Sequence, residues 1–190
     1  ATDVDVEFTS PKYHFDSTIY ANRVFDSKGV ADPDVEIKLG PNIKDWPAMI
    51  ELTDNIMLKV VSEIHDPVTT TDELIPSGET SSYRSNPLGL AEFALSRKDP
   101  EYVGRAKAVR EVETARQNGA SPVDSEFGDA YRVVTADDRF KDIDIDTVGL
   151  GSTIFAVKPG DGSAREQAAS CQRVLGGLAN IANEYATKRY

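Results

Sequence analysis

The pattern of apolar and polar positions is clearest over residues 56–64, a mostly apolar run rich in β-branched side chains. Such a run favours a strand, and Asp66-Pro67 ends it, because proline cannot continue a ladder of hydrogen bonds. Residues 127–134 and 148–157 have a similar composition, and we predict strands there too.

Apolar residues recur at helical spacing between the first two predicted strands, 56–64 and 127–134. Pro87 suits the first turn of a helix, which we expect to run to about Arg97 with its apolar residues on one face. Pro100 introduces a second helix, in which apolar residues recur at a spacing of three over residues 103–115. We expect Gly119 to end it, since glycine adopts the left-handed conformation common after a helix.

A strand, a glycine-rich loop and a helix follow one another after residue 153. Ser163 is predicted to be the N-cap of this helix, and Glu166, three residues later, would complete a capping box. Two adjacent glycines cost roughly 2 kcal/mol inside a helix, so we expect Gly176-Gly177 to end it and a short strand to follow at 178–181. A continuous helix to Tyr190 is the alternative, because the apolar spacing of three and four persists.

This alternation of strands and helices predicts an α/β domain. The first fifty residues are less regular: Val4–Phe8 and Val35–Lys38 alternate between apolar and polar, but prolines and glycines surround them. We interpret this part as an extended arm or interdomain linker, with edge strands of the same domain as the alternative. The chain begins at Ala1 and ends in an apolar and basic pattern, so we expect a piece of a longer polypeptide.

Composition narrows the function classes. The net charge of −11 disfavours general nucleic-acid binding and anionic membrane surfaces, both of which need basic residues. No apolar run approaches the roughly 18 residues of a spanning helix, and the start lacks the layout of a signal peptide. The single cysteine, Cys171, excludes an internal disulfide and a multi-cysteine metal cage made by this chain alone, and a cytoplasmic setting fits best.

An acidic run over residues 137–146 suggests a calcium loop. The glycine at the sharp turn and the glutamate at the end of such a loop are missing, so we interpret the run as a solvated loop.

The strongest candidate for chemistry is the loop from Gly160 to Glu166. A helix N-terminus presents unpaired N–H groups that bind anions, and Arg165 adds a bidentate fork for a carboxylate or phosphate. The same surroundings would stabilise an alkoxide on Ser163. The alternative is a capped helix with an exposed arginine. The loop is not a P-loop, because no Gly-Lys-Ser/Thr follows.

A second candidate comprises Thr70-Thr71-Asp72, Ser77-Gly78 and Arg84, followed by Ser85-Asn86-Pro87-Leu88. Arg84 precedes a predicted helix start, and loops at strand-to-helix junctions hold ligands in α/β sheets. Taken alone, an exposed arginine of no function is the default interpretation. We call residues 70–88 the threonine–aspartate segment and residues 160–177 the glycine–serine segment.

Together the two segments resemble the C-terminal swivelling domain of the aconitase family. The first matches Thr-Thr-Asp, a small-Gly turn, an arginine twelve residues after the aspartate, and Ser-Asn-x-Leu. The second has Gly162-Ser163-Ala164-Arg165-Glu166 where the family has Gly-Ser-Ser-Arg-Glu, and Leu-Gly-Gly follows in both. The resemblance covers residues 45–190 and implies a swivelling β/β/α-type fold, with residues 1–44 as the extended linker arm.

The resemblance also implies roles. Ser163 matches the catalytic serine, the base that removes the substrate's proton, and Asp72 matches an active-site aspartate that supports hydration through hydrogen bonds to a partner domain. Arg84 and Arg165 match arginines that bind substrate carboxylates. Ala164 replaces the family's second serine at the substrate site, so a hydroxyl that would contact substrate is lost and a hydratase-like relative of aconitase is plausible.

The implied activity is that of a hydro-lyase, which moves water across a C=C bond of a tri- or dicarboxylate. The family's [4Fe-4S] cluster is bound by cysteines of preceding domains, so the expected partners are those cluster-bearing domains and a small carboxylate substrate, and this chain alone should be inactive. The alternative is a non-catalytic anion-binding or interaction domain that kept the fold. A regulatory RNA-binding relative is disfavoured by the charge of −11.

Overall fold

The computed structural model describes residues 8–23 and 28–190 and divides the chain into two units, residues 1–39 and 40–190. In the first unit the described residues form one short helix, α1 (Thr18–Ala21), and all of them are exposed. No strand forms at Val35–Lys38. Most of the stretch Val4–Phe8 lies outside the described residues. The interpretation of residues 1–44 as a linker arm stays a prediction.

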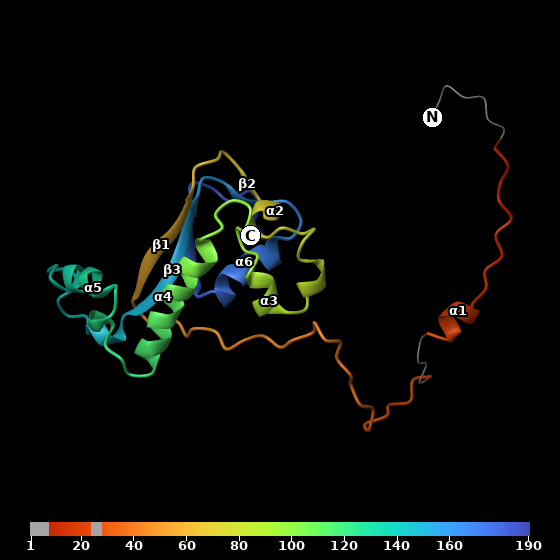
Figure 1. The fold of residues 1–190 in the computed structure, drawn as a ribbon, viewed down its shortest axis with the longest axis horizontal. Helices are drawn as coiled ribbons and strands as arrows, with labels where there is room; N and C mark the ends of the chain where they lie inside the picture. The colour runs from red at the N-terminus through yellow and green to blue at the C-terminus, as the bar shows by residue number, and fades with distance from the viewer. Residues whose placement is uncertain (1–7, 24–27) are drawn as a thin grey trace. The chain divides into compact units, whose positions relative to one another are not determined.

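The second unit contains a parallel sheet of three strands, β1 (Ile56–Ile64), β3 (Gly149–Ala156) and β5 (Gly177–Ala182). The strands lie in the order β1-β3-β5, so β3 is central, and it is buried over almost all of its length. These strands confirm the predictions at 56–64, 148–157 and 178–181. The preceding helix ends at Val174, before the two glycines, which excludes the continuous helix. The α/β class is therefore confirmed (Figure 1).

Helix α4 (Tyr102–Gln117) packs against β3 and β1 and confirms the helix predicted after Pro100. Its buried residues Tyr102, Ala106 and Val109 lie three or four apart and so share one face. The helix is followed by Gly119 in the left-handed conformation, with φ of +94°. The apolar spacing predicted the helix and the buried positions Ala106 and Val109, but Ala115 is exposed and Glu113 is buried.

The prediction of a strand at 127–134 is wrong, because these residues form helix α5 (Gly128–Thr135). Its apolar and polar positions follow a helical spacing: Tyr131 is buried, whereas its neighbours Ala130 and Arg132 are both exposed. Arg132 donates to Asp129 at 2.7 Å, an i,i+3 pair that only a helix brings together. The β-branched composition of Val133 and Val134 misled the sequence-based assignment.

The helix predicted from Pro87 to about Arg97 is shorter, since α3 covers only Pro87–Ala91. Asn86 caps it by accepting from the N–H of Gly89 at 3.0 Å. The chain leaves the helical path at Leu95, which has φ of +55° and donates its N–H to the carbonyl of Leu74 at 2.9 Å. This tertiary hydrogen bond replaces helical ones.

A second, two-stranded parallel sheet joins β2 (Thr69–Thr70) to β4 (Pro159–Asp161). Each strand is followed by a helix, α2 (Thr71–Leu74) after β2 and α6 (Arg165–Val174) after β4. The remaining elements are 3₁₀ helices η1 (Ser81–Tyr83), η2 (Pro122–Asp124) and η3 (Ile145–Thr147). No helix among the described residues is long and apolar enough to cross a membrane.

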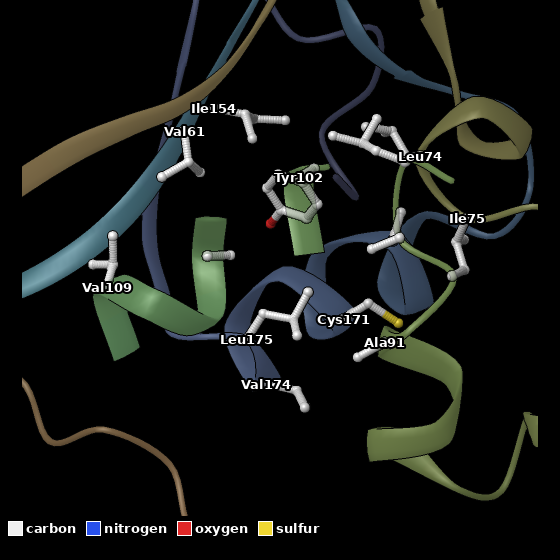
Figure 2. Packing of buried hydrophobic residues seen from close by; sticks show 14 of the residues in the cluster. Val61, Leu74, Ile75, Ala91, Tyr102, Val109, Ile154, Cys171, Val174 and Leu175 are labelled. Atoms are coloured by element: carbon white, nitrogen blue, oxygen red, sulfur yellow. The ribbon is translucent and has the colours of Figure 1, made fainter. Parts of the chain in front are cut away.

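The core lies between the three-stranded sheet and the helices. Figure 2 shows Val61 and Ile154 of the sheet facing Tyr102 of α4 and Leu175 at the end of α6. Leu74 of α2 and Ala91 of α3 extend the same cluster toward the second sheet. The three-stranded sheet and the helices α2, α3, α4, α5 and α6 thus share one interior.

One carboxylate is built into this interior. Glu113 of α4 is 0 % exposed and accepts the N–H of Leu150 at the start of β3, 2.8 Å away. Arg116 donates to it through two guanidinium nitrogens, at 2.7 and 2.9 Å, and Gln117 donates at 2.9 Å. Because the charge is paired and every bond is made, its burial is tolerated and it joins α4 to β3.

Candidate functional site

The threonine–aspartate segment and the glycine–serine segment lie next to each other because β2 pairs with β4. Thr69 and Thr70 stand opposite Pro159 and Asp161, and the N–H of Thr69 donates to the carbonyl of Lys158 at 3.0 Å. Because the strands are parallel, the residues that follow them emerge at the same edge. The threonine–aspartate segment and the glycine–serine segment, distant in sequence, therefore begin side by side.

Gly162 of the glycine–serine segment lies close to Thr71 of the threonine–aspartate segment. It has φ of +133°, and a Cβ at this position would lie 2.1 Å from Oγ1 of Thr71, which is buried. Only glycine tolerates both the backbone conformation and the distance. Thr71 and Gly162 thus set how the turn before Ser163 lies on α2.

Gly162→Ala is expected to lower the free energy of unfolding by about 2 kcal/mol or more, from left-handed strain and displacement of Thr71. Gly78→Ala is the matched control, because nothing lies within 4 Å of its Cβ position and its φ is ordinary. Urea unfolding of both variants measures the difference. Equal stabilities would contradict the close contact.

The predicted capping box at Ser163 is wrong. Helix α6 begins at Arg165, its N-cap is Ala164, and no side chain caps it. Ser163 lies one residue too early, in the turn that Gly162 imposes, and is exposed. Glu166 instead pairs with Arg189, whose Nε and Nη2 lie 2.8 and 2.6 Å from Oε1. Its own backbone N–H, and then Arg189, hold the pKa of Glu166 below the usual range.

Arg165, the first residue of α6, is half-buried. Its Nε is buried and has no hydrogen-bond partner among the described residues. A buried donor left without an acceptor is uncommon in a native protein. Because Ala164 cannot cap the helix, the N-terminus of α6 has no N-cap side-chain acceptor, which is the setting in which helix N-termini bind anions.

Asp72 is held by its own segment. Its Oδ1 accepts from the backbone N–H and the hydroxyl of Ser77, each at 2.9 Å, and its Oδ2 accepts from Arg97 at 2.9 Å. Arg97 is in turn paired with Glu79 at 3.0 Å. The N–H of Ser77 is the largest cause that lowers the pKa of Asp72 below its ordinary value. Asp72 is therefore an ionised acceptor, fixed in direction and half-exposed.

Arg84 lies at a cavity of about 390 Å³ that both segments line. Arg84 comes from the threonine–aspartate segment, and Glu166 and Gln167 come from the first turn of α6. No acidic side chain of the described residues is within ion-pair distance of Arg84. The remaining lining residues are Trp46, Pro87, Leu90, Ser170, Cys171 and Val174. Ser163, Arg165 and Asp72 do not line this cavity, so Arg84 joins the first turn of α6 without them.

Trp46 is a cavity residue that the sequence did not single out. The chain before β1 runs along α6: the N–H of Lys44 donates to the carbonyl of Ser85 at 2.8 Å, and Arg173 donates to the carbonyl of Ile50. Trp46 lies between these two anchors. The one feature of the sequence that could have drawn attention to Trp46 is that it is the only tryptophan. Arg97, which holds Asp72, gave no signal at all.

The residues of this chain do not fit an iron–sulfur cluster. Cys171 is buried within α6, and burial raises the pKa of its thiol to about 12, so it is a poor thiolate ligand. Within the part of the chain that the structure describes, no group of three His, Cys, Asp or Glu side chains could hold a metal ion, the acidic run 137–146 included. The described residues of this chain therefore offer no ligand set for such a cluster.

Comparisons with known proteins identified no family for this chain. A scan against models of protein families found no match, and searches of curated proteins and of solved structures found none either. The resemblance to aconitases therefore rests on the two signature segments alone.

Proposed function

We propose that this chain is the swivelling domain of an aconitase-like hydratase. The observation that carries the proposal is the pairing of β2 with β4, which sets Gly162 against Thr71. Two segments that resemble one family's active site in sequence are thus neighbours in space as well, although about ninety residues separate them (161 − 70 = 91). Chance matches to a motif would have no reason to meet.

Ser163 would act as the general base. A dehydration removes a proton from the carbon next to the one that bears the hydroxyl. The electron pair of the broken C–H bond forms the C=C bond as the hydroxyl leaves as hydroxide, which takes up a proton from solvent to give water. Ser163 is exposed in front of α6, where the helix N-terminus and the Arg165 guanidinium favour an alkoxide that accepts the proton from carbon.

The two arginines would bind the substrate's carboxylates. Among the residues that the structure describes, Arg84 has no acidic partner at the cavity, and the buried Nε of Arg165 has no acceptor. Asp72, ionised and held by Ser77 and Arg97, would accept a hydrogen bond from the partner domain. A substrate carboxylate on Arg165 would lie next to Ser163 in the chain, whereas Arg84 would bind its carboxylate at the cavity, which Ser163 does not line.

Arg165→Lys tests the carboxylate contact. In the full-length, cluster-loaded parent we expect KM to rise about tenfold, roughly 1.4 kcal/mol, with kcat changed little, because a point charge replaces a planar fork. Steady-state kinetics measure both constants. Arg139→Lys is the matched control, since Arg139 is highly exposed and its contacts, an ion pair with Asp137 and the ring of Phe140, are with neighbours in sequence. An unchanged KM for Arg165→Lys would remove this residue from the substrate site.

A non-catalytic anion-binding domain is the second candidate. The observation that favours it is Ala164, which stands at the N-cap of α6 and offers no hydroxyl to a substrate. Such a domain would bind a carboxylate at the same helix N-terminus but would not require Ser163. Kinetics of a Ser163 variant separate the two candidates.

A further inference from the structure

We propose that the cavity beside Arg84 is a binding site for a small carboxylic acid with an apolar branch next to its bound carboxylate, in preference to one with a further carboxylate there. This inference goes beyond the proposed function, because Ser163, Arg165 and Asp72 do not line the cavity. It follows from the walls of the cavity, the charges at its rim and its size.

The walls away from Arg84 are apolar. Pro87 and Leu90 of α3 and Val174 in the last turn of α6 are all buried side chains that line the cavity. Trp46, from the chain before β1, also lines it, although its side chain is largely exposed. The cavity follows α6 from its first turn to its last. A ligand that reaches along it from the first turn therefore meets hydrocarbon.

The charges allow one bound carboxylate. Arg84 is the cation among the lining residues, and the acidic residue Glu166 is paired with Arg189 outside the lining. Cys171 presents a neutral thiol, and the Ser170 hydroxyl donates to the carbonyl of Gln167 at 3.1 Å. A second carboxylate placed deeper would lose water without gaining a cation, which is costly.

The size fits a small branched acid. A volume of about 390 Å³ lies at the lower end of the range typical of ligand pockets, roughly 300 to 1,000 Å³. Burying one methylene group contributes about 0.8 kcal/mol, which is about a fourfold gain in affinity. A four-carbon branch that is only partly buried should therefore gain at least about tenfold.

The test is calorimetric titration of this chain with three probes: succinate, 2-butylsuccinate and propane-1,2,3-tricarboxylate. We expect 2-butylsuccinate to bind at least about tenfold more tightly than succinate, and the tricarboxylate to bind no more tightly than succinate. Arg84→Gln should weaken all three. Equal affinity for the two succinates, or a tricarboxylate that binds more tightly than 2-butylsuccinate, would overturn the inference, and so would a failure of every probe to bind.

Two variants locate the effect. Trp46→Ala should reduce the preference for the butyl group and leave succinate affinity unchanged. Leu52→Ala is the matched control, an exposed apolar residue of the same segment that does not line the cavity. A preference that survives both Trp46→Ala and Arg84→Gln would place the binding elsewhere and refute the inference. The hydratase proposal is judged separately, by Ser163 in the assembled parent, so the two can fail independently.

Discussion

Ser163→Ala is expected to lower kcat by at least about 10³ in the full-length, cluster-loaded parent, while KM moves little. At 1.36 kcal/mol per tenfold this is about 4 kcal/mol of transition-state stabilisation. The physical reason is that alanine cannot accept the proton, whereas the substitution leaves the proposed carboxylate contacts of Arg84 and Arg165 in place. Steady-state kinetics on the purified parent, with its cluster content verified, measure the effect.

The structure makes this variant easy to interpret. Ser163 is exposed and caps no helix, so its loss should change the free energy of unfolding by no more than about 0.5 kcal/mol. Ser10→Ala, at an exposed serine of the first unit, is the control. A kcat close to that of the unmodified parent, with an intact cluster, would reject Ser163 as the base and favour the non-catalytic anion-binding domain.

Glu113→Ala is expected to lower the free energy of unfolding by about 3 kcal/mol. Removing one partner of a buried ion pair leaves the other charge uncompensated, and here the Arg116 guanidinium and the N–H of Leu150 both lose their acceptor. Since this carboxylate joins α4 to β3, the loss is felt at the centre of the sheet. Urea unfolding followed by circular dichroism measures it.

Two further substitutions make the result specific. Glu111→Ala, at an exposed position of the same helix, should leave stability within about 0.5 kcal/mol. Glu113→Gln should fall between the two, because it keeps an acceptor oxygen for Leu150 but removes the charge that faces Arg116. If Glu113→Ala were no more destabilising than Glu111→Ala, the buried pair would contribute nothing to the fold.

Much of the framework is predictable from local pattern. The strands β1, β3 and β5 and the helix α4 were all expected within a few residues of their observed bounds. Each has a strong periodic or apolar signal, bounded by a proline or a glycine. Where burial and local preference agree in this way, the sequence alone suffices.

Prediction failed where a tertiary contact overrides the local preference. The helix after Pro87 was expected to continue, but Leu95 turns aside to bond the carbonyl of Leu74. The strand expected at 127–134 is helix α5, because β-branched side chains do not outweigh its helical spacing of buried and exposed positions. Ser163 has the right residue type for a cap, yet the left-handed turn at Gly162 starts the helix later.

The same distinction between local pattern and tertiary contacts applies to the candidate site. The sequence by itself determined which residue types are present, a serine, two arginines and an aspartate in two short segments, because motif chemistry is local. Only the tertiary structure decided their arrangement. Pairing of β2 with β4 brings the segments together, and the chain before β1 supplies Trp46 to the cavity of Arg84. Such proximity depends on strand register and on hydrogen bonds between distant residues, which no local pattern encodes.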